Sequence, residues 1–370
     1  MRGTKFLIHA WADDQQGMGE EKSQDSAQLE RNLEVAVREG LLDHVEGSNY
    51  RFSHSRIREG IRALLPVGNE LKNLQASLGR SLLEMSEEAN NDQLSDGMVL
   101  VAANLLNAST EDSDRKDLLE LNFRAAKIAT IRSAYAQAAK YFENARRFEV
   151  QEGKWDGDRY SFTYELLIHS AKCLLYTGDL EGCLAVTRDI TENVNSLEDR
   201  LPTVKLQAEA LLQLSRYDEG LQILLEALDA LGHHLPRRFL MFRFFQELNS
   251  ANNELRKMSD QDILDLPVNT DPMDQCKIDL LWSVATISAL TDREAYKGIA
   301  FLGVMRFVLK VGTVPGILPM CLSAAAMGYY KLGMMEMCDR LSKLTSVLLD
   351  NEGTENVHAA STICLSHFML

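Results

Sequence analysis

The sequence lacks the motifs by which most enzymes and small secreted proteins are recognised. It contains no GxxxxGK[ST] phosphate loop, no GxGxxG, no HExxH, no GxSxG and no kinase signature set. We therefore expect that this chain has no catalytic activity of its own. Its six cysteines are widely spaced and include no CxxC pair, which excludes a compact disulfide framework. Free thiols in a reducing, cytoplasmic compartment are the expectation.

Long apolar runs and basic clusters are also missing. The N-terminal stretch FLIHAW is too short for a signal or membrane helix, and prolines and a glycine interrupt the apolar run near 315–330. We expect no membrane partner. The net charge is −15, and residues 28–65 carry six arginines against six acidic residues. Because phosphate binding needs clustered positive charge, we expect no nucleic-acid partner.

What the sequence does contain is mostly helical periodicity. Residues 1–28 are acidic and polar, and we expect a disordered tail or linker there. Residues 29–66 predict a partial winged-helix module: a helix from Leu29, two short strands at 41–46 and 50–53, and a helix that stops at Pro66. Ser53 or Ser55 would cap that last helix. An ordinary α+β fragment is the alternative.

Three segments further along the chain resemble one another: 126–139, 171–184 and 208–221, with offsets of 45 and 37 residues. Small residues on a first helix let a second helix approach, a Gly or Ser reverses the chain, and an aromatic residue or Leu seals the hairpin. The fold class we predict is mostly all-α, a tetratricopeptide-like α-solenoid preceded by the partial winged-helix module. The expected repeat-packing residues are Ala126, Ser133, Tyr135, Ala171, Gly178, Leu180, Leu184, Ala208, Ser215, Tyr217 and Leu221.

This periodicity divides the rest of the chain into two regions. Residues 67–236 are predicted to hold a helical linker and the repeats, and residues 237–370 to hold further hairpins that are truncated, with a degenerate repeat at 327–338. The final stretch, 354–370, predicts a helix cut off before its partner. The chain would then be a piece of a longer protein.

An aromatic segment, PRRFLMFRFFQEL, covers residues 236–248. We expect Pro236 in the first turn of a helix whose Phe239, Phe242 and Phe245, together with neighbouring apolar residues, cover a broad buried face. Because arginines are interleaved with the aromatic residues, a nucleic-acid or membrane-surface helix is the alternative interpretation.

Two histidine positions raise the question of a metal site. His169 and Cys173 lie four residues apart, a spacing that allows two ligands on one helix, but no third ligand of fixed spacing accompanies them. His233 and His234 stand at a helix end before Pro236. We predict a packed repeat helix in the first case, a solvated helix end in the second, and no metal site.

Four phrases carry a family resemblance: EVAVREGLLDHVEGSNYRFSHSRIREGIRALLP, LNFRAAKIATIRSAYAQAAKYFENA, LLEALDALGHHLP and ILDLPVNTDP. In this order they resemble the end of the ATPase module and the helical arm of the large STAND-type signalling ATPases, which are joined to protein kinase, GAF and histidine kinase domains. The resemblance runs from about residue 29 to the end. It implies a regulatory segment that binds a protein or peptide in its helical groove, with ATPase and kinase modules in cis.

The resemblance also implies a role for His54, at the strand-to-helix junction in RFSHSR. In the family a histidine here reaches the bound diphosphate and holds the inactive state, so His54 is the expected nucleotide-sensing residue. Ser55 replaces the aspartate that usually follows, and a merely capped or packed histidine is the alternative. Since the ATPase core is absent, we expect no cofactor on this chain alone, and ATP or ADP only with an upstream ATPase module.

Two other functional classes compete with this interpretation. A transcriptional regulator would use the winged helix to read DNA and the helical arm as a sensor, which the balanced charge of residues 28–65 disfavours. A helical-repeat enzyme would need a cluster of titratable residues in a groove, and the sequence offers none.

Overall fold

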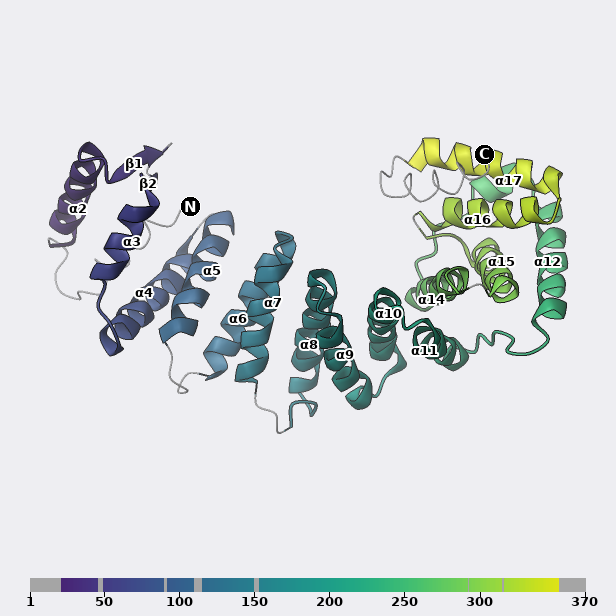
Figure 1. Ribbon diagram of the computed structural model, residues 1–370, viewed down its shortest axis with the longest axis horizontal. Helices are drawn as coiled ribbons and strands as arrows, with labels where there is room; N and C mark the ends of the chain where they lie inside the picture. The colour runs from purple at the N-terminus through teal and green to yellow at the C-terminus, as the bar shows by residue number, and fades with distance from the viewer. Residues whose placement is uncertain are drawn as a thin grey trace. The chain divides into compact units, whose positions relative to one another are not determined.

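The computed structural model describes residues 21–45, 49–89, 92–109, 115–149, 153–291, 293–314 and 316–352. Most of these residues are helical, which confirms the predicted fold class (Figure 1). The elements are α2 (Glu21–Arg38), β1 (Leu42–Val45), β2 (Asn49–Phe52), α3 (Ser55–Leu64), α4 (Asn69–Glu88), α5 (Asp92–Ser109), α6 (Arg115–Ile131), α7 (Tyr135–Phe148), α8 (Arg159–Thr177), α9 (Leu180–Asn193), α10 (Leu197–Gln213), α11 (Tyr217–Ala230), α12 (Leu240–Lys257), α13 (Asp260–Leu264), α14 (Pro272–Ala289), α15 (Glu294–Val311), α16 (Ile317–Lys331) and α17 (Met335–Glu352).

The chain divides into two compact units, Met1–Asp179 and Leu180–Leu370, and each has its own buried cluster. This boundary differs from those expected at residues 66 and 236. The reason is that burial continues from the second half of the repeats into the helices that follow: Leu221 and Leu224 of α11 belong to the same cluster as Ile278 and Leu281 of α14. Several predicted features lie outside the described residues: residues 1–20, part of the hairpin turn, Pro315 and the helix expected at 354–370.

The first elements of unit 1 are a helix, a hairpin and a helix, in the predicted order. β1 and β2 pair antiparallel, with Leu42 opposite Phe52. The expectation of a disordered segment up to residue 28 is wrong from Glu21 onward, where α2 begins. That segment is rich in Glu, Gln, Lys and Ala, which favour helix, and extending an existing helix requires no new nucleus.

The rest of unit 1 consists of packed helices. α4 packs on α5, α6 on α7, and α7 on α8. Asn122 of α6 is fully buried, and its side-chain amide exchanges two 2.8 Å hydrogen bonds with that of Asn107 in α5. Because a buried amide is costly to leave unsatisfied, this reciprocal pair fixes how α5 meets α6.

The predicted repeat turns share one backbone motif. Ser133, Gly178 and Ser215 follow the first helices of the three repeats, and each has a positive φ, of 56°, 82° and 59°. In each turn this residue donates to the carbonyl three residues back, and the next amide donates to the carbonyl five residues back, over 2.8–3.2 Å. These two bonds are the Schellman motif that closes helix C-termini. Gly333, in the degenerate repeat, makes the same pair.

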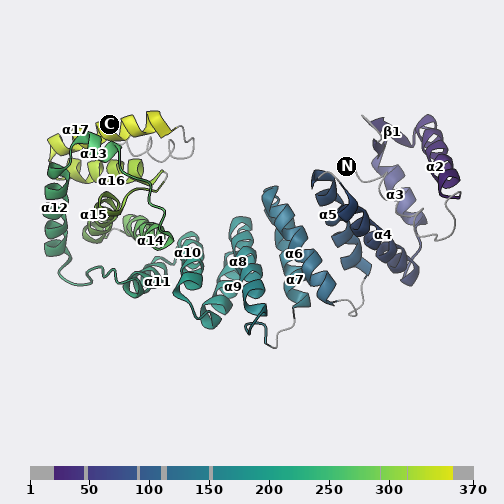
Figure 2. The same ribbon diagram turned by 180° about the vertical axis from the view of Figure 1, so that it is seen from behind.

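Unit 2 contains two kinds of packing. α9 packs on α10 and α10 on α11, whereas α14 packs on α15 and α16 on α17, with α12 against α15 and α13 against α17 (Figure 2). A short parallel bridge ties the ILDLPVNTDP phrase to the end of α15: the Asn269 amide donates to the Thr313 carbonyl over 2.7 Å, and the Thr313 amide donates to the Pro267 carbonyl. The Asn269 side chain also donates to the Val311 carbonyl. That phrase therefore has a structural role.

Candidate functional site

His54 lies at the junction between β2 and α3, where the resemblance expected a nucleotide-sensing residue. It is exposed, and it caps α3: its Nδ1 accepts a long, 3.5 Å hydrogen bond from the Arg56 amide. The prediction that Ser53 or Ser55 caps this helix is therefore wrong. Ser53 instead donates its hydroxyl to the Gly40 carbonyl, which joins the hairpin to the end of α2. An imidazole at a helix start can bind an anion through its other nitrogen.

The expected repeat-packing residues lie on α6 to α11 or in the turns that follow α6, α8 and α10. Their burial differs with their position: residues within the helices are buried and those next to the turns are partly covered. The buried residues are Ala126, Ala171, Leu184, Ala208 and Leu221. The half-buried residues are Tyr135, Leu180 and Tyr217, and the three turn residues Ser133, Gly178 and Ser215 are exposed. The centroid of the Tyr135 ring lies 4.8 Å from that of Tyr176, so Tyr135 contacts the neighbouring helix α8.

His169 and Cys173 are packed within unit 1. The His169 ring stacks parallel on the buried Phe142, and burial lowers its pKa below the usual value. The Cys173 sulfur lies 3.6 Å from the Thr130 hydroxyl, and burial raises the pKa of the thiol. Within the part of the chain that the structure describes, no group of three His, Cys, Asp or Glu side chains is arranged to hold a metal ion.

A polar cavity of about 550 Å³ lies between the α11–α12 connection, α12 and α15. Arg306 of α15 crosses it to reach Glu254 over 2.7 Å and Glu247, both on α12. These carboxylates raise the pKa of the guanidinium. His233 packs edge-on against Phe307, and burial lowers its pKa, so only His234 matches the solvated helix end expected for this pair.

The aromatic segment differs most from expectation. The Pro236 prediction is wrong, because α12 begins at Leu240 and its N-cap is Phe239, which has a φ of 54°. The buried-face prediction is wrong too. Phe239, Met241, Phe242 and Phe245 are 82%, 58%, 64% and 51% exposed. Only the stripe that continues along the helix is buried against α15: Leu248, Ala251 and Leu255.

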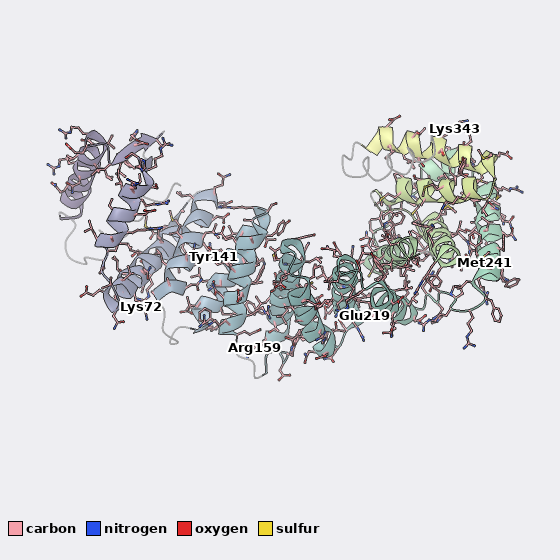
Figure 3. The ribbon with its side chains drawn as sticks, viewed as in Figure 1. Lys72, Tyr141, Arg159, Glu219, Met241 and Lys343 are labelled. Atoms are coloured by element: carbon pink, nitrogen blue, oxygen red, sulfur yellow. The ribbon has the colours of Figure 1, made fainter. Side chains whose placement is uncertain are left out.

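An apolar groove of about 230 Å³ opens beside this exposed face, between α12, α15 and α16. It is lined by one stripe from each helix. Met241, on α12 and labelled in Figure 3, is one of its lining residues. The Tyr329 ring forms part of the α16 wall, and burial raises the pKa of its hydroxyl to about 12. That hydroxyl has no hydrogen-bond partner among the described residues.

The charge around this groove has one sign. Among the residues that the structure describes, Lys297 and Lys331 line it and no acidic side chain does. The adjoining stretch from Pro236 to Gln246 adds three arginines and no acid. One of these, Arg237, is paired with Asp229. In a chain of net charge −15, this is a local positive region around an apolar cleft.

Part of this groove could have been found from the sequence. Its lining comes from α12 and from the consecutive helices α15 and α16 further along the chain, and periodicity alone does not bring α12 to them. One signal was available: the first half of α12 carries two apolar stripes, whereas only the stripe of Leu248 and Leu255 continues to the end of the helix. A stripe that stops after two turns is a poor candidate for core packing.

The described helices are each too short or too polar to cross a bilayer. Comparison with models of known protein families and with curated protein sequences finds no match to this chain. The resemblance to STAND-type ATPases therefore depends on the four sequence phrases and stays a prediction.

Proposed function

We propose that this chain is a protein-interaction segment that acts by binding a partner and has no catalytic activity of its own. The observation that carries the proposal is the exposed aromatic face of α12 beside the apolar groove. Four large apolar side chains, Phe239, Met241, Phe242 and Phe245, are each more than half exposed within seven residues. Such patches, when rimmed by polar residues, are typical of protein–protein interfaces.

Photo-crosslinking in the cells that express the protein tests this proposal. Phe242 of α12 and Tyr176 of α8 would each be replaced by p-benzoylphenylalanine; Tyr176 is the matched control, because it is also aromatic and about half exposed. We expect a discrete protein adduct from position 242 that is absent from position 176. Adducts from neither position, or the same adducts from both, would contradict the proposal.

We further propose that the segment belongs to a STAND-type signalling protein and relays the state of a nucleotide bound by an upstream ATPase module. The four family phrases support this, as does the exposed position of His54 at a helix start, where an anion is favourable. In this scheme α3 and the hairpin form the region that closes on the ATPase module. The helical arm then relays the nucleotide state to a kinase or another effector.

Two measurements address this second proposal. Sequencing the full-length transcript would show whether a GxxxxGK[ST] motif precedes this chain. If it does, ADP should protect the complete protein from proteolysis, and His54→Ala should reduce that protection, whereas Ser55→Ala, beside it on α3, should not. A transcript that encodes no upstream phosphate loop would remove the nucleotide role and leave partner binding as the function.

A further inference from the structure

The apolar groove between α12, α15 and α16 is the best-formed site that the function above does not yet assign a ligand. We infer that it binds an amphipathic helix of a partner protein whose apolar face is flanked by acidic residues. This inference specifies the partner chemistry of the protein-interaction function proposed above and therefore rests on it.

The size of the groove indicates side chains as its occupants. Pockets for drug-sized ligands measure roughly 300–1,000 Å³, whereas this groove measures about 230 Å³ and has few polar groups that could orient a small molecule. A few apolar anchors from one helix suit such a volume. Recognition by anchors at positions i, i+3, i+4 and i+7 is the usual mode when an amphipathic helix lies in a groove.

The groove walls allow a helix to approach closely. The α16 wall contributes Ala324, Ala325 and Gly328, and the exposed Gly328 has no atom within 4 Å of the position where a Cβ would stand. Small residues of this kind bring a second backbone near. Gly298 on α15 has a different role: the Phe244 ring occupies the space that its side chain would fill, since a Cβ there would lie 2.4 Å from the ring.

Charge complementarity selects an acidic helix. Of the described side chains that line the groove, the charged ones are Lys297 and Lys331, and the exposed Arg238 and Arg243 lie on the adjoining stretch. Glutamates or aspartates beside the partner's apolar face would meet these cations. A basic helix would instead face like charges.

Fluorescence polarisation with synthetic helices provides the test. The probe is a fluorescein-labelled peptide with leucines at i, i+3, i+4 and i+7 and glutamates on both flanks, and the comparison peptide carries lysines in place of the glutamates. With the full chain we expect micromolar binding of the glutamate peptide, about tenfold tighter than the lysine peptide at low salt. Reversing the charges in Lys297→Glu with Lys331→Glu should invert that preference.

Two glycines supply matched variants. Gly328→Trp places an indole in the groove, and Gly303→Trp places one in the neighbouring polar cavity; both glycines are within helices and have open space at the Cβ position. Both variants should fold, which circular dichroism checks. Gly328→Trp should weaken the glutamate peptide about tenfold or more, and Gly303→Trp should change its affinity by less than about twofold.

Several outcomes would overturn the inference. Failure of both peptides to bind, equal affinity for both, or an unchanged affinity in Gly328→Trp would each exclude an acidic helix in this groove. Self-association that Gly328→Trp abolishes would make a second copy the occupant, and cosedimentation with phosphatidylserine vesicles that it abolishes would make it a lipid surface. If crosslinks from Phe242 to a partner persist while the peptides fail, the proposed function stands and only this inference falls.

Discussion

At the scale of single residues, the hairpin turns depend on one left-handed position. Gly178 adopts this conformation without penalty, whereas Ser133 and Ser215 adopt it against the usual preference of a side-chain-bearing residue. Nothing lies within 4 Å of a Cβ placed on Gly178, so the penalty there would come from the backbone and not from a clash.

We expect Gly178→Ala to lower the free energy of unfolding by about 1 kcal/mol, and Ser133→Gly to raise it by up to about 1 kcal/mol. Gly97→Ala is the control: it lies inside α5 with open space around it, where alanine favours the helix by roughly 0.5–1 kcal/mol. Urea unfolding measures all three. A loss of stability in Ser133→Gly would show that the serine side chain, and not the backbone, matters at this turn.

His169 makes the stability of unit 1 depend on pH. Burial lowers its pKa in the folded state below the usual 6.5, so the unfolded chain binds the proton more readily. The neutral ring stabilises the fold fully above pH 6.5, and this contribution is lost as the pH falls below that value. We expect His169→Gln to flatten the fall in the urea midpoint between about pH 7.5 and about pH 5.5. An identical slope in the variant would assign the pH response to other groups.

At the scale of elements, α12 and α15 are joined both by apolar packing and by ion pairs. Leu248, Ala251 and Leu255 supply the packing, and Arg306 joins two carboxylates that lie seven residues apart on α12. All three charged side chains are about one-third exposed, so solvent screens part of their interaction.

Arg306→Ala should therefore lower the free energy of unfolding of unit 2 by about 1–2 kcal/mol. This loss lies between those typical of breaking an exposed and a buried ion pair. It leaves two carboxylates facing each other without their cation. Lys343→Ala, which breaks an exposed pair with Asp339, is the matched control and should change nothing measurable. If thermal unfolding shifts equally in both variants, the Arg306 pairs do not tie α12 to α15.

The helices and the turns that end them could be predicted from the sequence, because small residues and turn residues recur. The offsets of 45 and 37 between repeats could not be understood, since the difference lies outside the hairpins. Ten residues connect Phe148 to Arg159, whereas three connect Asn193 to Leu197. The exposure of the α12 aromatic residues was missed for a related reason: periodicity shows that a stripe is apolar but not whether another helix covers it.

At the scale of the whole molecule, each of the two large buried clusters lies within one unit. The first extends from Val99 to Cys173 and the second from Leu201 to Leu348. The repeat pattern ends near residue 236, whereas the buried cluster of unit 2 contains residues on both sides of that position. Two units with separate cores are expected to unfold in separate steps when their free energies of unfolding differ.

We expect two unfolding steps, each sensitive to variants of its own unit. Asn122→Ala leaves a buried amide without its partner and should cost unit 1 about 1–3 kcal/mol. Gly312→Ala should cost unit 2 about 2–4 kcal/mol, because its φ is 102° and a Cβ would lie 2.5 Å from the Pro267 carbonyl oxygen. Hydrogen exchange resolved by helix would follow both steps. A single step that both variants shift would mean that the chain unfolds as one.

The serines in the repeat turns have a consequence for how such a protein changes over generations. A serine codon of the AGC type becomes a glycine codon through one base change, so each turn can alternate between the two residues by point mutation. The backbone stays the same in either case, as Ser133, Gly178 and Ser215 show within one chain. A search pattern that requires glycine at the turn would therefore miss two of these three turns. Those two turns nevertheless contain the same two hydrogen bonds as the turn at Gly178.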